Sequence, residues 1–223
     1  MNVTPVIYGS VISPYVRKVL IALNKKKIPY DLKPLNPFNE SDKKLILTLN
    51  PLGQIPVYQE GEFVLSDSSA ICAYLEKKFP EPAIYPENNQ DYAKTLWMEE
   101  YADTHLIPSL ITVFFNTVLA PIFNRPSNHE AVETTLSSTL PHIFDYLDKE
   151  IVNTKFIVGD QLSIADISIG QLAIIHFDFF DFKIDISKWK RLSAYINNVA
   201  NNDLFKNEFL VALERLNKIR QRC

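Results

Sequence analysis

Short apolar runs and helical patterns alternate along the first 80 residues, and only helical patterns follow them. Three prolines separate the two parts: Pro80, Pro82 and Pro86. A residue that precedes proline disfavours the helical conformation, so this stretch is predicted to be a linker. We therefore predict an N-terminal α/β domain over residues 1–80, a linker over 81–88 and an all-helical domain over 89–223.

A strand–helix–strand unit is predicted at the start of the chain. Val3–Tyr8 and Tyr30–Leu35 are β-like runs, and the apolar residues of Pro14–Lys27 recur at helical spacing. Strands joined by such a crossover are parallel. The rest of this part is predicted as a helix at 41–49, two strands at 55–59 and 62–65 around the turn Glu60-Gly61, and a helix at 66–79. The predicted order is β-α-β-α-β-β-α.

The second part is predicted to contain helices only. Their predicted ranges are 91–119, 129–151, 163–177, 188–201 and 204–220. Pro108 is expected to kink the first helix, and Pro121 and Pro126 are expected to end it. Ser163 and Asp166 have the spacing of a capping box, which gives Asp166 a structural role.

Composition argues against several classes of protein. The net charge of −3 gives no sign of a nucleic-acid or anionic-membrane partner, and the four histidines lack metal-ligand spacing, so no metal site is predicted. Cys72 and Cys223 are too few for a disulfide framework, and no CxxC pair is present. No signal-peptide pattern or long apolar run was recognised. We therefore expect a cytoplasmic protein without a membrane segment.

Four motifs carry a resemblance to one family. They are SPYVRKVLIAL at 13–23, NPLGQIPV at 50–57, LSDSSAI at 65–71 and FIVGDQLSIADI at 156–167. Their order and spacing resemble the cytosolic glutathione S-transferases, in particular the serine-type classes (phi, tau and bacterial relatives). The resemblance covers nearly the whole chain. It implies a thioredoxin-like domain that binds glutathione, followed by an all-helical domain, and a homodimer.

The resemblance implies that Ser13 is the catalytic residue that stabilises the thiolate of glutathione. A thiol has an ordinary pKa of about 8.5, and lowering it by about two units needs roughly 2.7 kcal/mol. A hydroxyl donor at a helix N-terminus, together with the helix dipole, can supply that stabilisation. Ser10 is the alternative thiol partner, and Ser13 as a simple helix cap is the structural alternative.

Six further residues are implied to bind glutathione. Pro56 resembles the cis-proline of this fold, so Ile55 would offer its backbone to the cysteinyl unit and Gln54 would add side-chain contacts. Asp67 and Ser68 would hold the γ-glutamyl end at a helix N-terminus. Lys43 would meet the glycyl carboxylate, although relatives often place this cation slightly earlier. Simple capping, a trans proline and a solvated lysine are the alternatives.

The electrophilic co-substrate is expected to be small and largely apolar. Aromatic side chains are the candidates for its pocket, with ordinary core packing as the alternative: Tyr15, Phe38, Trp97, Tyr101, His105, Phe114 and Phe115. The predicted activity is transfer of glutathione. Another glutathione-dependent enzyme on the same fold (a peroxidase, reductase or isomerase) and a non-catalytic binding module remain alternatives.

Overall fold

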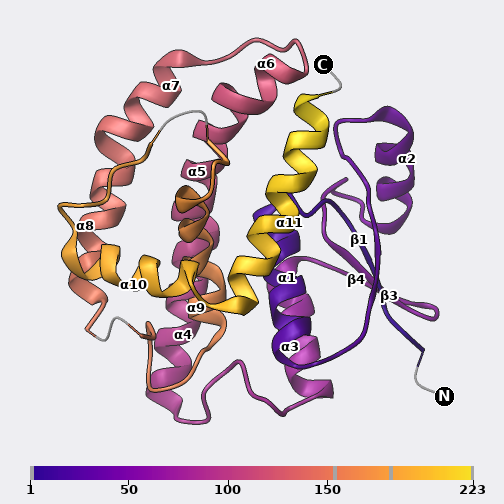
Figure 1. The fold of residues 1–223 in the computed structure, drawn as a ribbon. Helices are drawn as coiled ribbons and strands as arrows, with labels where there is room; N and C mark the ends of the chain where they lie inside the picture. The colour runs from indigo at the N-terminus through magenta and orange to yellow at the C-terminus, as the bar shows by residue number, and fades with distance from the viewer. Residues whose placement is uncertain (1–2, 153–154, 181–182, 222–223) are drawn as a thin grey trace. The chain divides into compact units, whose positions relative to one another are not determined.

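The computed structural model describes residues 3–152, 155–180 and 183–221. The chain divides into two compact units, Met1–Ile84 and Tyr85–Cys223 (Figure 1). The division falls inside the segment 81–88 that sequence analysis assigned to a linker. Each unit is described below by itself.

The first unit contains a four-stranded mixed sheet and three helices. Its elements are β1 (Val6–Tyr8), α1 (Pro14–Lys25), β2 (Asp31–Lys33), α2 (Glu40–Leu49), β3 (Val57–Glu60), β4 (Phe63–Ser66) and α3 (Ser68–Lys78). The strand order is β2-β1-β3-β4, with β1 and β2 parallel and the other pairs antiparallel. The predicted element order is confirmed, but β1 and β2 are shorter than predicted because only three residues of each pair in the sheet.

Helix α1 contributes more buried residues than any other element of this unit. Its residues from Val16 to Leu23 are all buried, and α1 packs against α3 on one face of the sheet (Figure 1). Helix α2 lies on the other side and buries only Ile46. Gly9 is required where β1 leaves the sheet, because a Cβ atom there would lie 2.6 Å from Val16 Cγ2.

The described residues of the second unit form helices joined by loops. A continuous helical run, Asn89–Ile122, contains α4 (Asn89–Tyr101), α5 (Ile107–Phe114) and α6 (Ala120–Ile122), joined by π-helical turns at Ala102–Leu106 and Phe115–Leu119. The first π turn ends just before Pro108, where a kink was predicted. Pro121 does not end the run, contrary to prediction, because a proline is tolerated in the first turn of α6.

The remaining helices agree with the predicted ones to within a few residues. They are α7 (His129–Thr134) and α8 (Leu140–Glu150), joined by a π turn at Thr135–Thr139, then α9 (Ile164–Ile169), which continues as a 3-10 helix over Gly170–His176, α10 (Lys190–Ala200) and α11 (Asp203–Arg220). No strand occurs in the part of this unit that the structure describes.

The sequence does contain a long apolar run, which sequence analysis had not recognised. Residues 106–123 carry no charged side chain, and the helical run Asn89–Ile122 is long and apolar enough, by length and composition alone, to cross a membrane. A helix in a protein core passes the same test. Leu106, Leu110 and Val113 of this run are buried.

Asp166 anchors the start of α9, as the capping-box prediction expected. Its Oδ2 accepts the Ser163 N–H at 2.9 Å, and its Oδ1 accepts the Ile157 N–H at 2.8 Å and the Tyr195 hydroxyl at 3.0 Å. Burial raises the pKa of this carboxyl, and the same hydrogen bonds oppose that shift. The group therefore holds a loop, a helix start and α10 together.

Candidate functional site

The register of the sheet aligns three of the predicted ligand-binding segments. Tyr8 at the end of β1 pairs with Val57 at the start of β3, and Val57 pairs with Ser66 at the end of β4. The three residues form one row across the sheet. The turn after β1, the segment before β3 and the start of α3 therefore leave the sheet at the same end, although they lie far apart in the sequence.

Ser13 caps the N-terminus of α1 by position but not by a side-chain bond. Its backbone is extended (φ −71°, ψ 126°), and Pro14 follows as the first helical residue. Its N–H donates to the Ser10 carbonyl at 2.9 Å. Its hydroxyl makes no hydrogen bond to any described residue. The hydroxyl is thus available to a ligand at the positive end of a twelve-residue helix.

Ser10, the alternative, takes part in its own turn. Its Oγ accepts a long hydrogen bond, 3.4 Å, from the Ile12 N–H. Arg17 holds the rest of this turn, because its Nη1 donates to the carbonyls of Val11 at 2.9 Å and Ile12 at 2.8 Å. Sequence analysis assigned Arg17 no role. The sequence does contain a signal for this role, because Arg17 is a charged residue inside the apolar run that forms α1. The structure shows that Arg17 is buried.

The bond between Ile55 and Pro56 is cis, as predicted. Neither the N–H nor the C=O of Ile55 bonds to a described residue, so both can pair with an extended ligand. Asn50 holds this segment: its Nδ2 donates to the Gln54 carbonyl at 2.9 Å, and its Oδ1 accepts the Leu52 N–H at 3.0 Å. The Gln54 side chain is exposed. Asn50 was quoted in the sequence motif but was given no function.

Asp67 and Ser68 differ in their side-chain hydrogen bonding at the N-terminus of α3. Asp67 Oδ1 accepts the N–H groups of Ser69 and Ala70, both at 2.9 Å, so the capping interpretation of Asp67 is correct. Its backbone has a positive φ of 76°, which is uncommon for a residue other than glycine. Ser68 is only 4% exposed, and its hydroxyl bonds to no described residue. Ser68 and the second oxygen of Asp67 are therefore available to a ligand.

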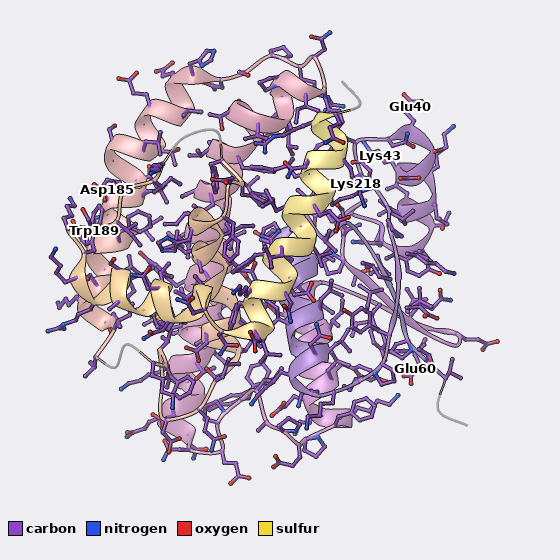
Figure 2. All side chains as sticks on the ribbon, viewed as in Figure 1. Glu40, Lys43, Glu60, Asp185, Trp189 and Lys218 are labelled. Atoms are coloured by element: carbon purple, nitrogen blue, oxygen red, sulfur yellow. The ribbon has the colours of Figure 1, made fainter. Side chains whose placement is uncertain are left out.

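Lys43 lies in the first turn of α2 and is exposed (Figure 2). Asn39 caps this helix by accepting the N–H groups of Ser41 at 3.0 Å and Asp42 at 3.1 Å. Asp42, the acidic residue next to Lys43, accepts the Asn36 N–H at 2.9 Å and so holds the loop that precedes α2. Among the described residues of the first unit, none forms a hydrogen bond or ion pair with the Lys43 ammonium.

The predicted aromatic residues occupy different environments. In the first unit, Tyr15 is half-buried and Phe38 is 43% exposed. In the second unit, Trp97, Tyr101 and His105 form one stripe, with Tyr101 stacked parallel to His105 at 5.1 Å between ring centroids.

Tyr146 of α8 joins this stripe and was missed by sequence analysis. Its ring lies 4.6 Å from that of Tyr101, and its hydroxyl accepts the Trp97 indole N–H at 2.6 Å. Phe114 and Phe115 lie further along the same helical run. Phe114 is buried and stacks on Phe179 at 4.6 Å, which is core packing, while Phe115 is half-buried. Among the described residues, no cluster of three or more histidine, cysteine or acidic side chains could hold a metal.

The fold is that of a thioredoxin-like domain joined to a helical domain. Family comparison agrees with that class. The family model "Glutathione S-transferase, N-terminal domain" matches residues 7–83, and "Glutathione S-transferase, C-terminal domain" matches residues 110–203. A glutathione S-transferase of Triticum aestivum is 31% identical over 191 residues, 85% of each chain. The chain therefore belongs to the glutathione S-transferase family, as predicted.

Solved structures with the same fold include glutathione transferases of plants and of a bacterium, Xanthomonas axonopodis. Glutathione transferase F2 of Populus trichocarpa superposes with a TM-score of 0.83 at 21% identity, over 94% of this chain and 99% of that one. A maize glutathione S-transferase I, solved with an atrazine–glutathione conjugate, gives a TM-score of 0.80 at 21% identity, over 94% and 98%. The predicted fold is thus confirmed, and by family the protein is a glutathione transferase that uses glutathione as co-substrate.

Proposed function

We propose that this transferase joins the thiolate of glutathione to a small, largely apolar electrophile, and that Ser13 is the residue that holds the thiolate. The observation that carries the proposal is the unbonded Ser13 hydroxyl at the N-terminus of α1. An O–H donor to a sulfur anion forms a charge-assisted bond, and the helix dipole adds to it. Together they can provide the roughly 2.7 kcal/mol that lowers the thiol pKa by about two units.

The other parts of glutathione find partners in the same unit. The cysteinyl backbone pairs with the N–H and C=O of Ile55, as an added strand would, and Gln54 contacts it from beside. The γ-glutamyl carboxylate bonds to the Ser68 hydroxyl and N–H at the N-terminus of α3. The ammonium of the same group bonds to the outer oxygen of Asp67. Lys43 pairs with the glycyl carboxylate across solvent, which is a weak contact.

The test of Ser13 compares Ser13→Ala with Ser10→Ala. Glutathione binding is measured by calorimetry, and turnover is measured with a chloronitrobenzene electrophile over a range of pH. We expect Ser13→Ala to bind glutathione with little change but to lose kcat. The loss is about 25-fold at pH 7, where a thiol pKa raised from about 6.5 to 8.5 lowers the thiolate fraction by that factor, and about 100-fold at a pH well below 6.5. The apparent pKa of kcat/KM rises in parallel. Ser10→Ala is expected to keep its rate.

Each other outcome assigns the site differently. If Ser13→Ala keeps its rate and Ser10→Ala loses it, Ser10 holds the thiolate. If the wild type binds no glutathione at millimolar concentration, the transferase proposal falls and a non-catalytic binding module replaces it. If the wild type binds glutathione but reduces peroxides and conjugates nothing, the chain is another glutathione-dependent enzyme.

We further propose that the protein acts as a homodimer in the cytoplasm and needs no added metal. The dimer and the compartment rest on the family, and light scattering and cell fractionation test them. Independence from metal follows from the proposed use of a hydroxyl and a helix dipole at the thiolate. Activity retained after dialysis against a chelator supports that step, and activity lost on dialysis and restored by metal contradicts it.

A further inference from the structure

Two buried lysines of the first helix reach across to α3. Lys18 is 1% exposed and Lys26 is 5% exposed. Lys18 Nζ donates to Ser69 Oγ at 2.9 Å, at the N-terminal end of α3. Lys26 Nζ contacts Glu76 at 2.6 Å and the Phe79 carbonyl at 2.6 Å, at the C-terminal end of α3. The two helices are therefore tied together at both ends of α3.

The hydrogen bond from Lys18 reaches the first turn of α3, which also carries the residues proposed to bind glutathione. Ser69 receives the Lys18 bond on its side chain and donates its backbone N–H to Asp67 Oδ1. Ser68, with its unbonded hydroxyl, lies between them. Lys18 itself belongs to α1, the helix that begins immediately after Ser13. A single side chain thus links the helix behind Ser13 to the turn that presents Asp67 and Ser68.

Burial makes both lysines dependent on the contacts that their ammonium groups make. A lysine is rarely fully buried, because its ammonium loses hydration. Lys26 recovers that cost with a carboxylate and two carbonyls, since it also bonds to the Pro82 carbonyl at 3.0 Å. It lies at the far end of α3 from the proposed site. The two lysines therefore contact α3 at opposite ends. Lys18 contacts the end that carries the proposed glutathione groups, and Lys26 contacts the end that does not.

We propose that Lys18 is a positioning residue for the γ-glutamyl end of glutathione. Its bond to Ser69 fixes the first turn of α3 relative to α1, so that Ser68 and Asp67 lie at the separation from Ser13 that one tripeptide spans. The proposal rests on the proposed function of the same site. It assigns Lys18 no contact with the substrate.

The experiment measures affinity for two ligands on the full-length protein. One ligand is glutathione, and the other is its analogue N-acetyl-cysteinyl-glycine, which lacks both the α-carboxylate and the ammonium of the γ-glutamyl group. The variants are Lys18→Met, Ser69→Ala, their combination, and Lys26→Met as the matched control. Thermal unfolding of every variant is recorded in parallel, so that loss of stability is separated from loss of affinity.

We expect Lys18→Met to weaken glutathione about tenfold and the analogue less than about twofold, because a displaced turn loses its contacts with the carboxylate and ammonium of the γ-glutamyl group, which the analogue lacks. Ser69→Ala shows the same selectivity more weakly. The double variant is no weaker than Lys18→Met, since the bond between Lys18 and Ser69 is already lost in Lys18→Met. Lys26→Met lowers the unfolding temperature and leaves both affinities within about twofold, because its contacts hold the opposite end of α3.

Three results overturn the proposal. The first is an equal loss for both ligands in Lys18→Met, which makes Lys18 a general stabiliser of the domain. The second is additive effects of the two substitutions. The third concerns the case in which Lys18→Met does not fold, so that Ser69→Ala is the only test. If the ratio of its affinities for the two ligands then equals that of the wild type, Lys18 has no positioning role. Failure of the wild type to bind glutathione is a different result, because it removes the proposed function together with this inference.

Discussion

Substitutions at Asp67 should separate stability from ligand binding. Asp67 caps α3 with two hydrogen bonds and does so at a φ of 76°. Loss of an aspartate cap to alanine costs about 1 kcal/mol, and alanine retains the strain of positive φ, so Asp67→Ala should lose about 1–2 kcal/mol of unfolding free energy. That loss corresponds to roughly 2–8 °C in Tm for a chain of this size.

Asp67→Gly should behave differently. Glycine at a cap loses only a few tenths of a kcal/mol, and it adopts positive φ without strain, which offsets the extra entropy of the unfolded chain of about 0.5–1 kcal/mol. We therefore expect nearly wild-type stability from Asp67→Gly. Both variants lose the carboxylate proposed to bind the ammonium of glutathione, so both should weaken glutathione about tenfold, in line with the 1.5–3 kcal/mol of a charged hydrogen bond.

Denaturant unfolding and calorimetry with glutathione, both at neutral pH, measure the two quantities. A stability loss in Asp67→Gly as large as in Asp67→Ala would refute the strain argument. Unchanged glutathione affinity in Asp67→Gly would refute the ammonium contact and leave Asp67 as a cap only. Asn39→Ala, which removes the matching cap of α2, controls for the general effect of losing a cap.

Three further changes test the packing around the site and the second unit. Asp166→Ala removes the acceptor of four hydrogen bonds, three of them buried, which should cost about 3 kcal/mol or more and lower Tm by roughly 6–12 °C; a thermal scan in which it matches the exposed variant Asp160→Ala would contradict this. Gly9→Ala should lose about 1–3 kcal/mol through the 2.6 Å approach to Val16, and the added variant Val16→Ala should restore part of it; urea unfolding without any rescue would show another cause. Arg17→Met should lower kcat about tenfold with a smaller change in glutathione affinity, because the turn before Ser13 loses two bonds to a charged donor; an unchanged kcat would mean that the turn holds its own shape.

Local patterns explain why the element order was predictable. Pro14 after Ser13, the glycine of the turn Glu60-Gly61 and the Ser163–Asp166 spacing each act within one turn of chain, so they can be recognised without the fold. The motif around Pro56 likewise indicated the cis bond. The errors lie where a local signal was given too much weight: Pro121 was expected to end a helix that continues past it.

Side-chain environments were less predictable. Trp97 and Phe114 belong to the same helical run and were assigned the same role, yet Trp97 is 52% exposed and Phe114 is 7% exposed. Helical spacing identifies which side chains share a face, but the neighbouring helices decide whether that face is covered. Tyr146 could not be linked to Trp97 from sequence, because their hydrogen bond joins residues 49 positions apart.

The sequence by itself determined the kinds of element, their order and the motifs that identify the family, because each depends on residues a few positions apart. Tertiary structure alone decided the row of Tyr8, Val57 and Ser66, which brings the Ser13 turn, Ile55 and Asp67 to one end of the sheet. It also decided that the buried Lys18 meets Ser69, 51 residues away. Such contacts depend on strand register and on the packing of α1 against α3, which no local pattern encodes.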